Sequence, residues 1–137
     1  MSAYLLDTDT ASYLLRADRE AVAAMRRSGA TDISISAVTQ AELLYGARLR
    51  SASPAIMTAV CAFLERVNVH VWDENAAEHH AEIRVAARAA GRSAGAFDMM
   101  ITAHARSLGV TLVTSDKAIV SLGVEGLVIE SWSRARR

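Results

Sequence analysis

The chain has 137 residues with 15 basic and 15 acidic side chains, so its formal net charge is zero. The signs also balance within each half: residues 1–69 carry seven of each, and residues 70–137 carry eight of each. This pattern excludes a charged tail, and it excludes a domain that binds nucleic acid through a large excess of positive charge. The hydrophobic fraction of 52% is too high for a disordered chain. A chain of this length is expected to form one hydrophobic core, as a single domain over residues 1–137.

The cysteine count and the apolar runs narrow the class further. Cys61 is the only cysteine, which excludes an internal disulfide framework and a multi-cysteine zinc site. It lies in an apolar stripe and is expected to be a small buried residue. No apolar run approaches the ~20 residues that span a bilayer, and no N-terminal stretch has the order of a signal peptide. We therefore expect a cytoplasmic protein with no membrane contact.

Five short segments have the composition of β-strands, because they are apolar and either β-branched in part or alternating. In chain order they cover residues 3–6, 32–36, 67–72, 110–114 and 127–129. The segment 32–36 gives the weakest of these signals, since its two isoleucines alternate with Asp and Ser.

Helical segments rich in Ala, Leu and Arg lie between these strands. One helix is expected over residues 19–28, between the N-cap Asp18 and Gly29, and a second over residues 54–66, beginning at Ser53-Pro54. A third is expected to begin at the capping-box pattern Asn75-Ala-Ala-Glu78 and to end at Gly91. The last is expected over residues 97–108 and ends at Gly109. Strands that alternate with helices over this length predict an α/β domain with a mostly parallel central sheet.

Four acidic residues fall where strands of such a sheet end or where the next helices begin. Asp7 follows the first strand directly, and Asp116 comes two residues after the strand ending at Thr114. Glu42 lies in the first turns of the helix after the second strand, and Asp98 lies in the first turn of the last long helix. Because the carboxyl ends of parallel strands and the N-termini of the following helices share one edge, we expect all four to converge there.

Each of these acids also has a purely structural explanation. Glu42 can complete a capping box with Thr39, Asp98 is favoured by the helix dipole, and Asp116 suits a turn. Asp7 is the hardest to explain in this way, because a charge at the end of a buried strand is costly unless it is compensated.

Four converging carboxylates require a compensating cation, since like charges raise one another's pKa. Hard oxygen ligands in this number are the set that Mg²⁺ or Mn²⁺ prefers. The sequence therefore predicts a divalent-metal site formed by Asp7, Glu42, Asp98 and Asp116.

Other polar residues are weaker candidates for the metal site. Asp9 either caps a helix that starts near Thr10 or supports the acidic site. His79 and His80 are adjacent, cannot share one helix face, and are expected on a helix surface. His104 lies six residues after the last helix's acid and is expected in packing or at the surface.

Four segments together resemble the motifs of PIN-domain ribonucleases, and most closely those of the VapC-type toxins of type II toxin–antitoxin modules. They are Tyr-Leu-Leu-Asp7-Thr-Asp9-Thr, Ser-Ala-Val-Thr-Gln-Ala-Glu42-Leu-Leu-Tyr-Gly, Phe97-Asp98-Met-Met-Ile-Thr-Ala-His-Ala and Thr-Leu-Val-Thr114-Ser115-Asp116. The resemblance covers nearly the whole chain, including the terminal Gly126-Leu-Val-Ile-Glu-Ser-Trp132. Each motif is short, and their order and spacing together carry the specificity.

The resemblance implies a three-layer α/β/α PIN-like fold and a Mg²⁺- or Mn²⁺-dependent endoribonuclease that leaves 5′-phosphate and 3′-hydroxyl ends. Asp7, Glu42, Asp98 and Asp116 match the family's acidic residues position by position. By this likeness Asp7 and Asp98, helped by Glu42, hold the principal metal ion.

The fourth motif and the residue before Asp98 depart from the common pattern. Phe97 stands where many relatives have Asn, and Thr-Ser-Asp-Lys replaces the usual Thr-Asn-Asn. Asp116 is therefore either a ligand or a support residue. Thr114 matches a hydroxyl residue of this motif, and Asp9 is a lesser site candidate.

The resemblance also implies partners. A small VapB-type antitoxin would block the acidic pocket and carry the DNA-binding element, so that DNA is contacted only indirectly. The substrate would be a transfer or ribosomal RNA, and the protein would form a homodimer. The apolar stripe on residues 54–66 gives weak independent support for the homodimer, because it is wider than one core-facing side needs.

Two other functions stay open. Asp7-Thr-Asp9-Thr after an apolar strand also resembles the motif of haloacid-dehalogenase-type phosphatases, in which Asp7 would be the nucleophile. That class needs a lysine and a paired late acidic motif, whereas here Lys117 directly follows Asp116 and the chain is short. In the other alternative the protein is mainly a non-catalytic subunit that binds an antitoxin.

The zero net charge does not exclude RNA. If four acids belong to a metal site, 15 basic and 11 acidic groups remain, an excess of four positive charges. Fourteen of the 15 basic residues are arginine, whose planar fork matches phosphate. Candidate phosphate contacts are Arg48, Arg50, Arg84, Arg88, Arg92, Arg134, Arg136 and Arg137, with a solvated helix face as the alternative for the middle three. Neutrality thus excludes only non-specific, charge-driven binding.

Overall fold

A five-stranded sheet forms the centre of the computed structural model, which describes residues 3–49 and 51–133. All neighbouring strands are parallel, in the order β3-β2-β1-β4-β5. The strands are β1 (Ala3–Leu6), β2 (Asp32–Ser36), β3 (Asn68–His70), β4 (Thr111–Val113) and β5 (Ile129–Glu130). The α/β class with a parallel sheet is therefore confirmed.

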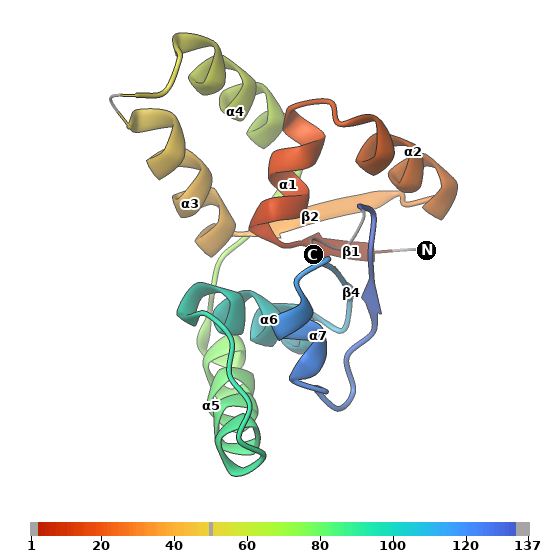
Figure 1. The fold of residues 1–137 in the computed structure, drawn as a ribbon, viewed down its shortest axis with the longest axis vertical. Helices are drawn as coiled ribbons and strands as arrows, with labels where there is room; N and C mark the ends of the chain where they lie inside the picture. The colour runs from red at the N-terminus through yellow and green to blue at the C-terminus, as the bar shows by residue number, and fades with distance from the viewer. Residues whose placement is uncertain (1–2, 50, 134–137) are drawn as a thin grey trace.

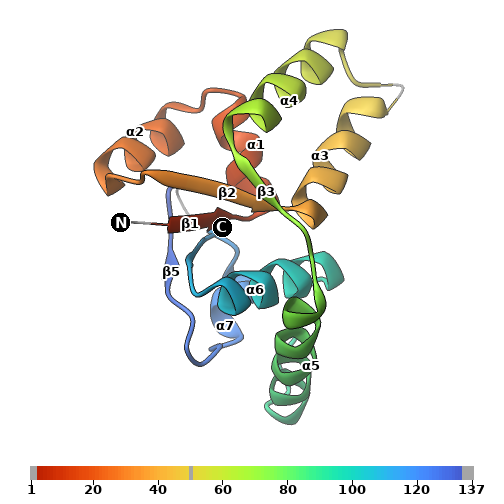
Figure 2. The same ribbon diagram turned by 180° about the vertical axis from the view of Figure 1, so that it is seen from behind.

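The helices cover both faces of this sheet. They are α1 (Thr8–Leu15), α2 (Arg19–Ser28), α3 (Ala37–Arg48), α4 (Pro54–Arg66), α5 (Glu74–Ala89), α6 (Ala96–Leu108) and α7 (Lys117–Ser121). Figures 1 and 2 show α1 to α4 on one side of the sheet and α5 to α7 on the other, which gives the expected three layers. In the described part of the chain no helix is long and apolar enough to cross a membrane.

Alternating side chains of the central strands fill the two cores. Leu6 of β1 and Val113 of β4 are fully buried in the cluster under α1 to α4, whereas Leu5 and Leu112 pack against Ile101 of α6 on the opposite face. Successive residues of a strand point to opposite faces, so a strand covered on both sides is apolar throughout. Both layers of helices thus pack against one sheet. That residues 1–137 form a single domain stays a prediction.

The helix-ending signals of the sequence act as expected at α2. The Asp18 side chain accepts a hydrogen bond from the backbone N–H of Ala21 at 3.0 Å, which satisfies a free donor of the first turn. Gly29 ends the helix in the left-handed conformation at φ 67°, which costs a glycine little.

The start of α5 and the edge strands differ from the sequence prediction. Asp73 caps α5 by accepting from the N–H of Ala76 at 3.1 Å, so the capping box expected at Asn75 is wrong. Aspartate and asparagine are equally good caps, and the pattern alone did not rank them. The strand expected over 67–72 is reduced to the three residues of β3 that pair with β2, and the strand expected over 127–129 is found as β5 at Ile129–Glu130.

The apolar stripe of α4 is mostly used inside the protein. Ile56, Met57, Val60 and Phe63 pack into the cluster under α1 to α4. Cys61 is exposed, so its expected burial is wrong: it lies outside the sector of the helix that faces the core. The stripe therefore no longer supports a homodimer, which stays a prediction.

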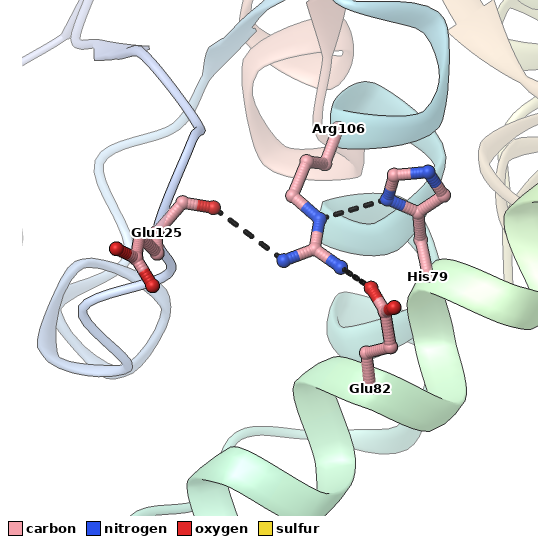
Figure 3. A network of polar contacts seen from close by, with 4 residues as sticks. All are labelled: His79, Glu82, Arg106 and Glu125. Carbon is pink, nitrogen blue, oxygen red and sulfur yellow. Dashed lines mark hydrogen bonds and ion pairs between the residues drawn. The ribbon is translucent and has the colours of Figure 1, made fainter.

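A polar network fixes α6 against α5 and the segment before β5 (Figure 3). Arg106 of α6 donates through Nε to His79 Nδ1 at 2.8 Å and forms an ion pair with Glu82. Its third contact is with the backbone carbonyl of Glu125 at 3.4 Å. The guanidinium fork can make these contacts from one plane, whereas a lysine cannot. His79, expected on the surface, is thus half-buried and holds the helix that carries Asp98.

Trp132 closes the core after β5. It is 1% exposed, and its ring lies 5.3 Å from the ring of Tyr4 of β1, centroid to centroid. Its indole N–H donates to Glu130 Oε1 at 2.9 Å, so the polar edge of the ring is satisfied.

Replacing Trp132 with alanine is expected to lower the free energy of unfolding by about 3–5 kcal/mol, the usual loss for a buried tryptophan. Urea unfolding followed by far-UV circular dichroism measures this change. Val128→Ala is the control, because Val128 is 66% exposed and its loss should cost below about 0.5 kcal/mol. A loss under about 1 kcal/mol for Trp132→Ala would contradict the structural role given to this ring.

Candidate acidic active site

The strand order places a crevice between the carboxyl ends of β1 and β4. The chain leaves β1 toward β2 and β3 on one side, and later returns to β4 on the other side. Ligands of open parallel sheets bind at such a switch point. Asp7 follows β1 here, and Thr114 to Asp116 follow β4.

Asp7 is a buried carboxylate with both oxygens engaged. It is 2% exposed, and it caps α1 by accepting from the N–H of Thr10 at 2.8 Å through Oδ1. Oδ2 accepts from the Thr114 hydroxyl at 2.5 Å. Burial raises the pKa of Asp7, these hydrogen bonds oppose the rise, and the charge of Asp9 adds to it. Asp7 and not Asp9 is therefore the cap of α1, contrary to one reading of the sequence.

Glu42 projects from the second turn of α3 toward the β1–α1 junction. The helix cap is Ser36, which accepts from the N–H of Val38 at 3.1 Å, so the capping box of Thr39 with Glu42 is wrong. Glu42 Oε1 accepts instead from the hydroxyl of Thr8 at 2.5 Å, and this hydroxyl also lies 3.3 Å from Thr39 Oγ1.

The pKa of Asp98 is raised by burial and by the charges of the other acids, which shows that these acids lie near it. It lies in the first turn of α6, after the helix cap Gly95. Burial, followed by the charges of Asp116, Asp7, Glu42 and Asp9 in that order, raises the pKa of Asp98 to about 6. In the described part of the chain its carboxylate accepts no hydrogen bond that would oppose the rise. The other three predicted site residues and Asp9 thus lie within electrostatic reach of Asp98.

Asp116 is both a helix cap and a neighbour of the site. Its Oδ1 accepts from the N–H of Ala118 at 2.8 Å at the start of α7. Its own N–H donates to Thr114 Oγ1 at 3.0 Å, and the same hydroxyl donates to Asp7. Thr114 therefore links the two acids that follow β1 and β4.

A cleft opens beside this acidic edge, between α1 and the start of α7. Its walls include Asp9 and Tyr13 on one side and Ser115, Asp116 and Lys117 on the other. Asp9 is exposed there, which suits a supporting position and not a buried one. The cleft gives the acidic edge an opening to solvent.

The donor set fits a hard divalent cation that keeps part of its water shell. In residues 3–49 and 51–133 no three His, Cys, Asp or Glu side chains lie close enough together to hold a metal ion between them. Magnesium is usually bound by one or two carboxylates with waters in the remaining positions, so an open acidic edge is the expected host. Burial is the main cause of the raised pKa of Asp98, and the repulsion from the neighbouring acids that adds to it is what such an ion would remove.

His104 and the two arginines of α5, Arg84 and Arg88, do not contribute to this edge. His104 is buried beside His70, and burial, then His70, lowers its pKa. Arg84 and Arg88 are exposed on α5, which projects away from the sheet (Figures 1 and 2). Arg50, Arg134, Arg136 and Arg137 lie outside the described residues.

Sequence reasoning missed Thr8, whose hydroxyl bonds Glu42 across 34 positions of the chain. The available signal was a hydroxyl residue directly after the first acid.

Comparisons with known proteins identify the family of this chain. The PIN domain family model matches residues 4–124. The tRNA(fMet)-specific endonuclease VapC of Shigella flexneri is 32% identical, over 97% of this chain and 100% of the relative. The protein of the same name from Salmonella typhimurium is 30% identical, over 96% of this chain and 99% of the relative.

Solved structures give the same result. The crystal structure of DNA-bound VapBC from Salmonella typhimurium matches with a TM-score of 0.83 and 30% identity, over 97% of this chain and 100% of that chain. VapBC-1 from nontypeable Haemophilus influenzae matches with a TM-score of 0.81 and 28% identity, over 95% and 98% of the two chains. This chain belongs to the PIN-domain family, and within it to the VapC group.

Proposed function

We propose that this protein is the toxin of a type II toxin–antitoxin module and acts as a Mg²⁺- or Mn²⁺-dependent endoribonuclease. The observation that carries the proposal is that Asp7 and Asp116 follow β1 and β4 at the switch point of the sheet, and that their charges and that of Glu42 act on Asp98 at the start of α6. Relatives that match 93–97% of this chain are named endonucleases or ribonucleases. We place its action in the cytoplasm, where such an RNA substrate is found.

Asp7, Asp98 and Glu42 would hold the principal ion, directly or through water, and Asp116 would complete the site or support a second ion. When bound, the ion activates water and neutralises the negative charge that develops on the scissile phosphate. The products would carry 5′-phosphate and 3′-hydroxyl ends.

The protein's own groups set the positions of these carboxylates. Thr114 and the N–H of Thr10 hold Asp7 in its buried position. Asp98 lacks such donors in the described structure, and it must lose its proton, with a pKa of about 6, before it binds a cation.

The relatives also support the proposed partners. The matching structures from Salmonella typhimurium and Haemophilus influenzae are VapBC complexes, and the former is bound to DNA. We propose a VapB-type antitoxin for this chain, with DNA contacted through it, and a homodimer of the toxin. The relatives named tRNA(fMet)-specific endonucleases favour transfer RNA over ribosomal RNA as the substrate.

The first test compares RNA cleavage by the wild-type protein and by Asp7→Asn, with Mg²⁺ or with EDTA. We expect EDTA to abolish cleavage and Asp7→Asn to reduce its rate about 100-fold or more. Replacing even a residue that only hydrogen-bonds a metal ligand lowers metal affinity or activity about 10–100-fold. Sequencing the cleaved ends checks the predicted phosphate and hydroxyl. Asp18→Asn is the matched control, since Asp18 caps α2 as Asp7 caps α1 but lies outside the site.

Cleavage that persists in EDTA and in Asp7→Asn would contradict the proposal. Growth arrest on expression separates the enzyme from a non-catalytic antitoxin-binding subunit. Arrest that persists in an Asp7→Ala, Asp98→Ala double variant would show that binding and not catalysis is the active principle.

Metal binding is expected to weaken as the pH falls through about 6, the raised pKa of Asp98. A proton on Asp98 competes with the cation, so the apparent Mn²⁺ affinity should drop about tenfold between pH 7.5 and pH 5. Titration of the RNA-free protein, followed by the electron paramagnetic resonance of free Mn²⁺, measures this. An affinity that is flat across this range would contradict the role given to Asp98.

Asp98→Asn is expected to stabilise the metal-free protein at pH 7.5. The folded pKa lies above the unfolded value, so the folded state binds more protons, and stability falls as the pH rises from about 4 to about 6. Removing the charge should recover about 1 kcal/mol, after allowance for partial exposure and solvent screening. Urea unfolding in EDTA measures the gain, which should shrink at pH 4. A variant that is less stable at both pH values would contradict this electrostatic account.

A further inference from the structure

The hydroxyl of Thr8 joins two segments that carry acids of the site. Thr8 is the first residue of α1 and follows Asp7 directly. Its Oγ1 donates to Glu42 Oε1 at 2.5 Å and lies 3.3 Å from Oγ1 of Thr39, which is fully buried in the first turn of α3. The contact therefore spans α1 and α3 at the level of the acids.

The contact has a counterpart on the other side of the site. Thr114 donates to one oxygen of Asp7, also at 2.5 Å. A neutral hydroxyl that donates to a carboxylate stabilises its ionised form and fixes the orientation of the carboxylate. Thr114 matches a hydroxyl residue of the family's fourth motif. The contact between Thr8 and Glu42 joins the first two motifs to each other.

We propose that Thr8 is a positioning residue for the metal site: its hydroxyl holds one carboxylate oxygen of Glu42 and leaves the other oxygen for the cation. This inference rests on the proposed metal-dependent function. It assigns Thr8 to metal binding through Glu42, and not to direct contact with the ion.

Glu42 needs such a partner more than the aspartates do. A glutamate side chain loses more rotamer freedom than an aspartate when it is held in one place. The charges of Glu42 and Asp98 repel each other. A hydrogen bond from α1 keeps the carboxylate at the edge of the sheet against that repulsion.

A structural role alone would give a different result. In that case Thr8 would simply tie α1 to α3, and its loss would lower stability without a specific change in metal binding. The two roles are separable because Thr8 and Glu42 are only partly buried. Water can replace the hydroxyl in the fold, but it cannot orient the carboxylate.

The test uses Thr8→Val, which keeps the shape and removes the hydroxyl, and Thr8→Ser, which keeps the hydroxyl. Mn²⁺ affinity is measured on the RNA-free protein by electron paramagnetic resonance, and unfolding in EDTA is measured in parallel. We expect Thr8→Val to bind Mn²⁺ about tenfold more weakly and Thr8→Ser to stay within about threefold of wild type. Thr58→Val, at an exposed position of α4, is the control for loss of a threonine hydroxyl elsewhere.

A double-variant comparison makes the assignment specific. If Thr8 acts through Glu42, then Thr8→Val should lower Mn²⁺ affinity no further in a Glu42→Gln background. An equal loss in both backgrounds would overturn the inference, as would Mn²⁺ binding by Thr8→Val within twofold of wild type. Thr8→Ser that binds as weakly as Thr8→Val would overturn it too.

Failure of the proposed function is a distinct outcome. If Asp7→Asn binds Mn²⁺ as the wild type does, the metal site itself is wrong, and the inference about Thr8 falls with it. If Asp7→Asn loses Mn²⁺ while Thr8→Val keeps it, the proposed function stands and the role given to Thr8 is wrong.

Discussion

The burial of the Asp7 carboxylate is the constraint on which the rest of the structure depends. A charge that is 2% exposed is tolerated only if its oxygens are hydrogen-bonded. The N–H of Thr10 and the hydroxyl of Thr114 satisfy them, and the N–H of Asp7 donates to the carbonyl of Val113 at 3.0 Å. These contacts end β1, begin α1 and tie both to β4. The switch point of the sheet is therefore built around one acid.

The acids of the site differ in how their charge is compensated. Asp7 and Glu42 each receive a threonine hydroxyl, and Asp116 receives a backbone N–H of α7. Asp98 has no such donor in the described chain, and it feels the charges of the other three. Burial, followed by these charges, raises its pKa to about 6, whereas at Asp7 the hydrogen bonds oppose the rise that burial causes. A cation bound beside Asp98 would therefore relieve a repulsion that no hydrogen bond of the described chain offsets.

The sequence predicted the layers and the acids better than the contacts between them. Local signals such as Asp18 and Gly29 depend on a few neighbouring residues, so they located α2 correctly. The edge position of all four acids followed from the parallel sheet alone. The contact of Thr8 with Glu42 joins residues 34 positions apart, and no local pattern contains it. The exposure of Cys61 depends on the direction in which α4 faces, which periodicity leaves open for a wide apolar stripe.

Structural and catalytic explanations of these acids are not alternatives in this fold. Asp7 caps α1 and Asp116 caps α7, so both begin a helix at the same edge where their remaining charge can serve a metal ion. Helix N-termini point at this edge because every parallel strand ends there, and aspartate is among the best caps. Helix capping alone is therefore enough to place carboxylates at this edge, whether or not they bind a metal ion. Asparagine separates the two roles, because its amide oxygen still accepts the capping hydrogen bond but carries no charge. Alanine removes both at once, and the loss of activity in an alanine variant cannot by itself be assigned to the metal.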